Sequence, residues 1–180
     1  MNVLPLALIV LGGCFLVCST IWLVVPAIHG LPWVPTHEAR IRRALQLADL
    51  QPGETLYDLG SGDGRVLLLA AREFGAQAIG VEIGPMQCLV SWARAWLSGS
   101  WGRVRTRCGN FYKADFRDAD VVFVYLTSGQ TTRLCPLLEA QLRPGTRVVS
   151  IAADIPNWQP VFIDRALLIF VYTMRPPSTG

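Results

Sequence analysis

The sequence predicts an α/β fold, in which helices flank a mostly parallel sheet, preceded by one apolar helix. Short apolar runs of strand length alternate with helical patterns from residue 55 onward. A glycine-rich turn within TLYDLGSGDGR (55–65) joins the first such run to a helix. Alternating strand and helix units build parallel sheets with right-handed crossovers. We therefore expect one domain over residues 31–180, of about the usual domain size, after an N-terminal segment of residues 1–30.

The N-terminal segment is expected to be a transmembrane anchor. No Asp, Glu, Lys or Arg precedes Glu38, and residues 3–28 are mostly apolar. At about 1.5 Å per residue, this stretch spans a hydrocarbon core of about 30 Å. A cleaved signal peptide is the alternative, but it needs a basic start and a shorter apolar core. Arg40, Arg42 and Arg43 follow the segment, so the positive-inside rule predicts a single-pass membrane protein with a cytoplasmic C-terminal domain.

The composition excludes several function classes. The chain is 52% hydrophobic and 16% charged, with a net charge of +3. No ribbon of basic and aromatic residues supports nucleic-acid binding. Only two histidines are present, so we expect no transition-metal site. The five cysteines form no C-x-x-C pair, and reduced thiols are expected in a cytoplasmic domain.

The remaining elements follow from periodicity and from turn residues. Thr36 is a candidate cap for the first helix of the domain, and Pro85 suits the first turn of a later one. The predicted helices cover residues 36–48, 65–74, 85–98 and 128–142. The predicted strands cover residues 55–59, 77–83, 104–108, 120–126, 146–152, 161–163 and 167–173, and the last two form a closing hairpin.

Two motifs indicate a nucleoside-binding site. Asp58 ends an apolar run and is followed by Gly60, Gly62 and Gly64. Dinucleotide-binding turns place the third glycine one residue later, so this turn suits a nucleoside with a small charged tail. Glu82 lies near the end of the next strand, where a carboxylate can accept hydrogen bonds from both ribose hydroxyls. A glycine-rich turn with an unrelated surface glutamate is the alternative.

Together these motifs resemble the class I S-adenosylmethionine-dependent methyltransferases. The resemblance implies a Rossmann-like fold, with a seven-stranded, mostly parallel sheet and an antiparallel closing hairpin. It also implies S-adenosylmethionine as the cofactor. The residues implied to bind it are Asp58, Gly60, Ser61, Gly62, Asp63, Gly64, Glu82, Ile83, Asn110, Phe111 and Thr36.

A narrower resemblance covers about residues 31–174. The lead-in LPWVPT (31–36), the D-G-R ending of the glycine turn, Tyr125-Leu126 and Trp158-Gln159-Pro160 are similar to the archaeal protein-lysine methyltransferases. They are also similar to the membrane-anchored mitochondrial methyltransferases that act on a lysine of the c subunit in ATP synthase. This likeness implies a lysine side chain of a protein as the methyl acceptor.

The chain departs from the wider class at two places. Asn110 stands where many relatives have an aspartate for the adenine amino group, and its amide oxygen can still accept that hydrogen bond. The Asn/Asp-Pro-Pro-aromatic motif of many amino-group methyltransferases is absent after the fourth strand. Tyr125 is the candidate catalytic residue there, and an ordinary strand-end tyrosine is the alternative.

The expected function is therefore membrane-anchored methyl transfer from S-adenosylmethionine to a lysine of a protein, one of the membrane in particular. Two alternatives remain: a lipid or small-molecule methyltransferase, and a noncatalytic membrane module that binds the cofactor. Trp92 and Trp96 lie four residues apart on one predicted helix. Core packing is favoured for this pair over a membrane-facing or substrate-facing stripe.

Overall fold

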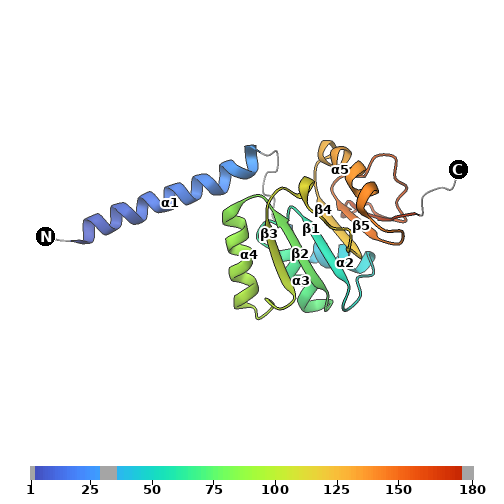
Figure 1. Cartoon of the computed structure of the whole chain (residues 1–180), viewed down its shortest axis with the longest axis horizontal. Helices are drawn as coiled ribbons and strands as arrows, with labels where there is room; N and C mark the ends of the chain where they lie inside the picture. The colour runs from blue at the N-terminus through green and yellow to red at the C-terminus, as the bar shows by residue number, and fades with distance from the viewer. Residues whose placement is uncertain (1–2, 29–35, 176–180) are drawn as a thin grey trace.

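The computed structural model describes residues 3–28 and 36–175. The first of these ranges is helix α1 (Val3–Ile28), which extends away from the rest of the chain (Figure 1). Within the described residues, no helix has both the length and the apolarity of a membrane span. The lead-in residues 31–35, which include Trp33, and the expected boundary after residue 30 lie outside the described residues.

The second range forms an α/β domain around one sheet. The five parallel strands are β1 (Thr55–Leu59), β2 (Gln77–Glu82), β3 (Val104–Cys108), β4 (Val121–Tyr125) and β5 (Arg147–Ile151). An antiparallel hairpin, β6 (Phe162–Asp164) and β7 (Ile169–Thr173), closes the sheet. The order is β3-β2-β1-β4-β5-β7-β6, so the expected seven-stranded, mostly parallel sheet with an antiparallel hairpin is confirmed.

Helices cover both faces of the sheet. Helices α2 (Glu38–Leu47), α3 (Arg65–Glu73) and α4 (Pro85–Leu97) pack on one face, where alternate strand residues such as Leu56 and Phe123 are buried. Helix α5 (Ser128–Gln141) packs on the other face, against Tyr57 and Val122. This alternation follows from the two-residue period of strands. It leaves the carboxyl ends of β1, β2 and β4 at one edge of the sheet.

The observed boundaries lie within one or two residues of the predicted ones, with three corrections. Thr36 does not cap α2, because His37 occupies the cap position and its side chain makes no capping hydrogen bond. A short 3-10 helix, η1 (Phe111–Lys113), was not expected. Cys88 in α4 and Cys108 at the end of β3 are joined as a disulfide with Cα atoms 6.1 Å apart, so reduced thiols were the wrong expectation for this pair.

The expectation of core packing for Trp92 and Trp96 is also wrong. Trp96 is 71% exposed and Trp92 is 51% exposed. The residues that α4 buries are Gln87, Cys88, Ser91 and Ala95. These small and polar side chains let α4 approach the sheet closely, so the larger apolar ones remain on its outer side.

Candidate cofactor-binding site

The turn between β1 and α3 is held in a conformation that requires glycine. Gly60, Gly62 and Gly64 have φ angles of 96°, 53° and 78°, in the left-handed region that side chains disfavour. The N–H of Gly60 donates to the carbonyl of Val81 at 2.9 Å, which fixes the turn to β2. A Cβ at Gly64 would clash with Ser91 of α4, whereas no atom lies within 4 Å of the position of a Cβ at Gly60. The turn is therefore packed behind Gly64 and open above Gly60.

Glu82, at the end of β2, is the second support of this turn. Its carboxylate is buried and accepts the N–H of Gly62 at 2.8 Å and the N–H of Gly84 at 2.8 Å. Each carboxylate oxygen has two acceptor sites, so one on each oxygen remains for a ligand. Glu82 therefore holds the turn while keeping capacity for two hydroxyl donors, as a ribose presents.

Asp58 is a buried carboxylate without a cationic partner in the described part of the chain. It is 3% exposed, and no described residue forms an ion pair or hydrogen bond with its side chain. Burial raises its pKa well above the ordinary value, and the negative charges of Glu82 and Asp63 raise it further. A buried charge of this kind is costly unless it is paired. The site is therefore complementary to a ligand that brings a positive charge.

Asp63 has a different environment, although it belongs to the same turn. Its carboxylate pairs with Arg65 at 2.8 Å and with Arg94 of α4 at 2.5 Å. Burial raises the pKa of Asp63, but the hydrogen bonds and charge of Arg65, with the charge of Arg94, outweigh burial and lower it overall. Arg65 also donates to the carbonyl of Thr36 at 3.0 Å, which brings Thr36 to the turn. Direct cofactor contacts of Asp63 and Thr36 stay predictions.

The loop after β3 carries the residues predicted to contact adenine. The side-chain oxygen of Asn110 accepts the N–H of Tyr112 at 2.9 Å and caps η1, which leaves one acceptor site on that oxygen. The N–H of Gly109 donates to the carbonyl of Glu82 at 2.7 Å, so this loop adjoins the glycine turn. The Phe111 ring is buried in the core on the α5 face, and Ile83 is half-buried. Their adenine contacts stay predictions.

Tyr125 ends β4 at the same edge of the sheet. It is half-buried, and the guanidinium carbon of Arg40 lies 5.5 Å from the centre of its ring. Arg40 is itself held by a hydrogen bond of 2.7 Å to the carbonyl of Leu167. Among the described residues, none forms a hydrogen bond with the Tyr125 hydroxyl. The structure brings Tyr125 to the edge that holds Asp58 and Glu82.

The structure adds three arginines that the sequence analysis did not assign to the site: Arg40, Arg65 and Arg94. Arg65, in the D-G-R ending, is the only one with a local sequence signal, because it follows Asp63 by two residues. Arg40 and Arg94 reach the site from α2 and α4, which only the packing of those helices reveals.

A separate pocket lies on the α5 face, away from the glycine turn. Its volume is about 570 Å³, and Tyr57, Arg107, Asp115, Arg117, Asp118 and Arg143 line it. Tyr57 donates to Asp118 at 2.9 Å, and Arg107 lies over the Tyr57 ring. Burial, followed by that hydrogen bond, raises the pKa of Tyr57 to about 12. None of the predicted site residues lines this pocket.

Comparison with known proteins identifies the family. Residues 58–162 match the ANTKMT methyltransferase domain. The chain is 40% identical over 131 residues to a protein-lysine N-methyltransferase of Saccharolobus islandicus (strain REY15A), covering 72% of this chain and 81% of that protein. It is 33% identical over 161 residues to the adenine nucleotide translocase lysine N-methyltransferase of Mus musculus, covering 84% and 69%.

It is also 31% identical over 139 residues to the ATP synthase c-subunit lysine N-methyltransferase of Xenopus laevis, covering 76% of this chain but only 61% of that protein. Among solved structures, an RNA methyltransferase from Salinibacter ruber in complex with S-adenosyl-L-homocysteine is similar, with a TM-score of 0.77 and 38% identity. That match covers 81% of this chain and 97% of the other.

The site fits the cofactor that this family uses. Unpaired Asp58 is complementary to the cationic methionine end of S-adenosylmethionine, the remaining acceptors of Glu82 suit the ribose hydroxyls, and the space above Gly60 admits a ligand close to the backbone. The chain belongs to the ANTKMT methyltransferase domain family and is an S-adenosylmethionine-dependent methyltransferase.

Proposed function

We propose that this protein is a membrane-anchored protein-lysine N-methyltransferase. The observation that carries the transfer chemistry is the buried Asp58, which lacks a cationic partner beside the turn held by Glu82. The lysine acceptor is supported by the relatives from Saccharolobus islandicus, Mus musculus and Xenopus laevis, which are all named as lysine N-methyltransferases.

The chemistry requires alignment more than acid or base strength. Bound S-adenosylmethionine supplies a methyl group already activated on a sulfonium. The protein has to bring a neutral amine into line with that methyl, and orientation of this kind contributes about 7–11 kcal/mol to rate enhancement. A free lysine has a pKa of about 10.4. Nearby positive charge and removal from water favour the neutral amine.

Tyr125 and Arg40 are placed for this task. The Tyr125 hydroxyl has no partner among the described residues and can accept a hydrogen bond from an incoming amine. Arg40 packs on the Tyr125 ring and fixes its orientation. The guanidinium also disfavours an approaching ammonium, because like charges repel. We therefore assign Tyr125 to orientation of the acceptor.

Membrane attachment through α1 is part of the proposal. The helix is 26 residues long and has no charged side chain, and its described apolar side chains, such as Phe15 and Leu16, are exposed. Arg40, Arg42 and Arg43 follow on α2, which supports a cytoplasmic catalytic domain. A short connection between helix and domain keeps the domain near the bilayer. We therefore propose an acceptor lysine on a membrane protein.

The test is a methyl-transfer assay with tritiated S-adenosylmethionine and membranes from the source cell. The full chain is compared with Asp58→Asn, which removes the proposed cofactor contact, and with Asp115→Asn as a control. Asp115 lies in an exposed pair with Arg117. The protein, lipid and RNA fractions are counted separately after the reaction.

Label in a membrane protein, identified as methyl-lysine by mass spectrometry and lost only in Asp58→Asn, is the expected result. Label in the lipid fraction instead would favour the lipid alternative. Label confined to RNA would replace the lysine acceptor with a nucleic acid, the substrate class named for the Salinibacter ruber structure. Cofactor binding without methyl transfer to the protein, lipid or RNA fraction would contradict the proposal.

A further inference from the structure

Helix α4 turns small and polar side chains toward the sheet and large apolar side chains outward, the reverse of most helices that pack on a sheet. It directs Gln87, Cys88 and Ser91 toward the sheet. Its outer side carries exposed apolar side chains, and the loop that follows the helix adds one more, Trp101. We call this surface the α4 aromatic face, and it consists of Leu89, Trp92, Trp96, Leu97 and Trp101. A helix that covers a sheet ordinarily buries its apolar stripe, so packing within the domain does not account for this face.

The exposure of the face is large. Trp96, Leu97 and Trp101 are 71%, 75% and 70% exposed. Three exposed tryptophans within ten residues of the chain differ from the scattered single apolar residues that are normal on proteins. Leu89, Trp92 and Trp96 are separated by three and four residues and therefore lie along one side of the helix, with Leu97 next to Trp96 in sequence.

Trp92 is held in a fixed orientation within this face. Its indole N–H donates to the carbonyl of Thr106 in β3 at 3.1 Å. The only polar atom of the side chain is thus satisfied by the protein, and the half of the ring that remains exposed is hydrocarbon. Contact with an apolar phase would cost this side chain no unpaired hydrogen bond.

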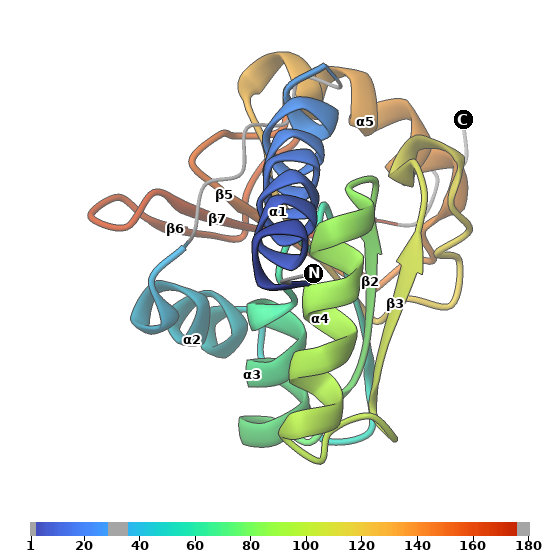
Figure 2. The same cartoon turned by 90° about the vertical axis from the view of Figure 1, so that its left-hand side faces the viewer.

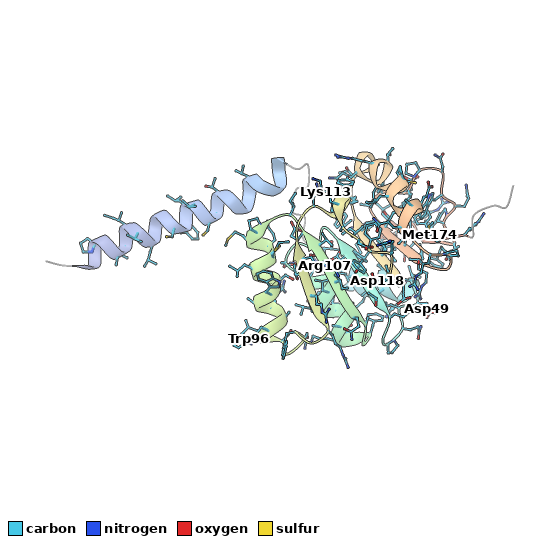
Figure 3. The ribbon with its side chains drawn as sticks, viewed as in Figure 1. Asp49, Trp96, Arg107, Lys113, Asp118 and Met174 are labelled. Atoms are coloured by element: carbon cyan, nitrogen blue, oxygen red, sulfur yellow. A yellow bond between two sulfur atoms is a disulfide. The ribbon has the colours of Figure 1, made fainter. Side chains whose placement is uncertain are left out.

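The position of the face matches the direction of α1. Helices α1 and α4 are in contact, and α1 extends away from the side of the domain on which α4 lies (Figure 1). Viewed from the N-terminal end of α1, α4 stands in front of the sheet (Figure 2). Trp96 lies on the outer side of α4, at the end farther from α1 (Figure 3). A bilayer crossed by α1 would therefore lie on the side of the domain that α4 covers.

The sequence that carries the face has no acidic residue. Residues 83–114 contain no Asp or Glu. Of their basic residues, Arg94 is paired with Asp63 and Arg107 lies over the Tyr57 ring on the α5 face, so Arg103 is the basic residue next to the face in sequence. Arg103 is two residues from Trp101, and neither Arg103 nor Arg105 forms an ion pair within the described part of the chain. Basic side chains beside a membrane surface are attracted by anionic headgroups. Tryptophan is enriched in the headgroup layer itself.

We propose that the α4 aromatic face rests in the headgroup layer of an anionic phospholipid bilayer and orients the catalytic domain on it. This proposal relies on the proposed anchoring by α1 and gives that anchor a second point of contact. Two points define an orientation that a single helix leaves free. Because α4 supports the glycine turn through Ser91 and Arg94, the contact also sets how the cofactor site faces the membrane.

The test uses the full chain in nanodiscs of anionic lipid, assembled at one chain per disc, with and without brominated acyl chains that quench nearby tryptophan. A Trp96→Phe/Trp101→Phe variant keeps the face apolar but removes two reporters. Trp158→Phe is the control, because Trp158 bonds to Glu139 on the α5 side. We expect the absolute emission lost to bromine to fall in the double variant and to stay unchanged in the control.

A second comparison keeps every tryptophan. Leu97→Glu puts a charge into the face and should lower the quenching to that of the double variant. Val161→Glu, at another exposed apolar position, should not. Equal bromine quenching in wild type, the double variant and Leu97→Glu would overturn the proposal. If the variants change bromine quenching by the same amount in discs of zwitterionic lipid, the role given to anionic headgroups is overturned.

The outcomes also separate this proposal from the anchoring on which it relies. A chain that fails to enter the discs contradicts anchoring by α1, whereas a chain that enters but shows no quenching difference contradicts only the α4 contact. The face could instead bind a second copy of the chain. In detergent, protection of Trp96 and Trp101 from acrylamide quenching would then increase with protein concentration, and the measured mass would double. That result would overturn the proposal.

Discussion

Replacing Asp58 by asparagine tests the central assignment of the site, because it removes a charge and hardly changes the shape of the side chain. Asp58 is 3% exposed and has no cationic partner among the described residues. A ligand's positive charge would therefore form a desolvated, charge-assisted hydrogen bond with it. Such bonds contribute about 1.5–3 kcal/mol, and at about 1.4 kcal/mol per tenfold this is roughly a 10- to 150-fold loss of affinity.

The same substitution should stabilise the ligand-free protein at neutral pH. Burial and two neighbouring carboxylates raise the folded-state pKa of Asp58. A raised pKa means that this group favours folding below its unfolded pKa of about 3.9, and that the benefit is lost as pH rises through the folded pKa. The asparagine of the variant would not titrate. The melting temperature of the variant relative to wild type should therefore increase as pH rises.

Calorimetric titration with S-adenosylhomocysteine and thermal unfolding without ligand measure both effects. The Asp115→Asn control, an exposed carboxylate paired with Arg117, should change neither the affinity nor the relative pH dependence at neutral pH. Unchanged affinity in Asp58→Asn would refute the contact with the cationic end of the cofactor. A clearly lower melting temperature of the ligand-free variant would refute the claim that the charge is unpaired.

Three further substitutions test the rest of the site. Glu82→Gln leaves one oxygen to accept the two N–H groups of Gly62 and Gly84, so cofactor affinity should fall at least about tenfold and amide exchange in the glycine turn should increase. The control is Glu73→Gln, in an exposed pair with Arg42, and unchanged amide exchange in Glu82→Gln would show that Glu82 does not hold the turn. Tyr125→Phe keeps the ring beneath Arg40 and should lower kcat while leaving cofactor affinity unchanged. Tyr112→Phe, whose ring also lies beneath an arginine, is the control, and a normal kcat in Tyr125→Phe would exclude its hydroxyl from orientation of the acceptor. Gly64→Ala should lower the free energy of unfolding by more than Gly53→Ala. Both glycines have a positive φ, which costs a side chain about 1–2 kcal/mol, but only the Cβ at Gly64 meets Ser91. Equal losses of unfolding free energy in chemical denaturation would show that the turn tolerates the contact.

Much of the fold follows from local patterns in the sequence. The strands were predicted within two residues because most of them are short apolar runs bounded by turn residues, as Thr55–Leu59 is by Gly53 and Gly60. The glycine turn, Asp58 and Glu82 were also apparent, because the turn needs glycine at fixed positions and parallel strands bring their carboxyl ends to one edge.

The partners of these residues were not apparent from local patterns. Thr36 looked like a helix cap, but His37 takes that position and Thr36 is tied instead to Arg65. Cys88 and Cys108 lie 20 residues apart, and only the packing of α4 beside β3 brings them together. The direction of α4 was likewise hidden, because a helix with both small polar and aromatic stripes can pack by either one.

The sequence alone determined where the strands and helices lie, which turn approaches a nucleoside and which two carboxylates flank it. These features depend on neighbours along the chain, through backbone conformation and the period of apolar residues. Only the tertiary structure decided that no described cation pairs with Asp58 while Arg65 and Arg94 pair with Asp63. It also decided that Arg40 covers Tyr125 and that α4 turns its tryptophans outward. Charge pairing and burial depend on residues distant in sequence, and those meet only when the helices pack on the sheet.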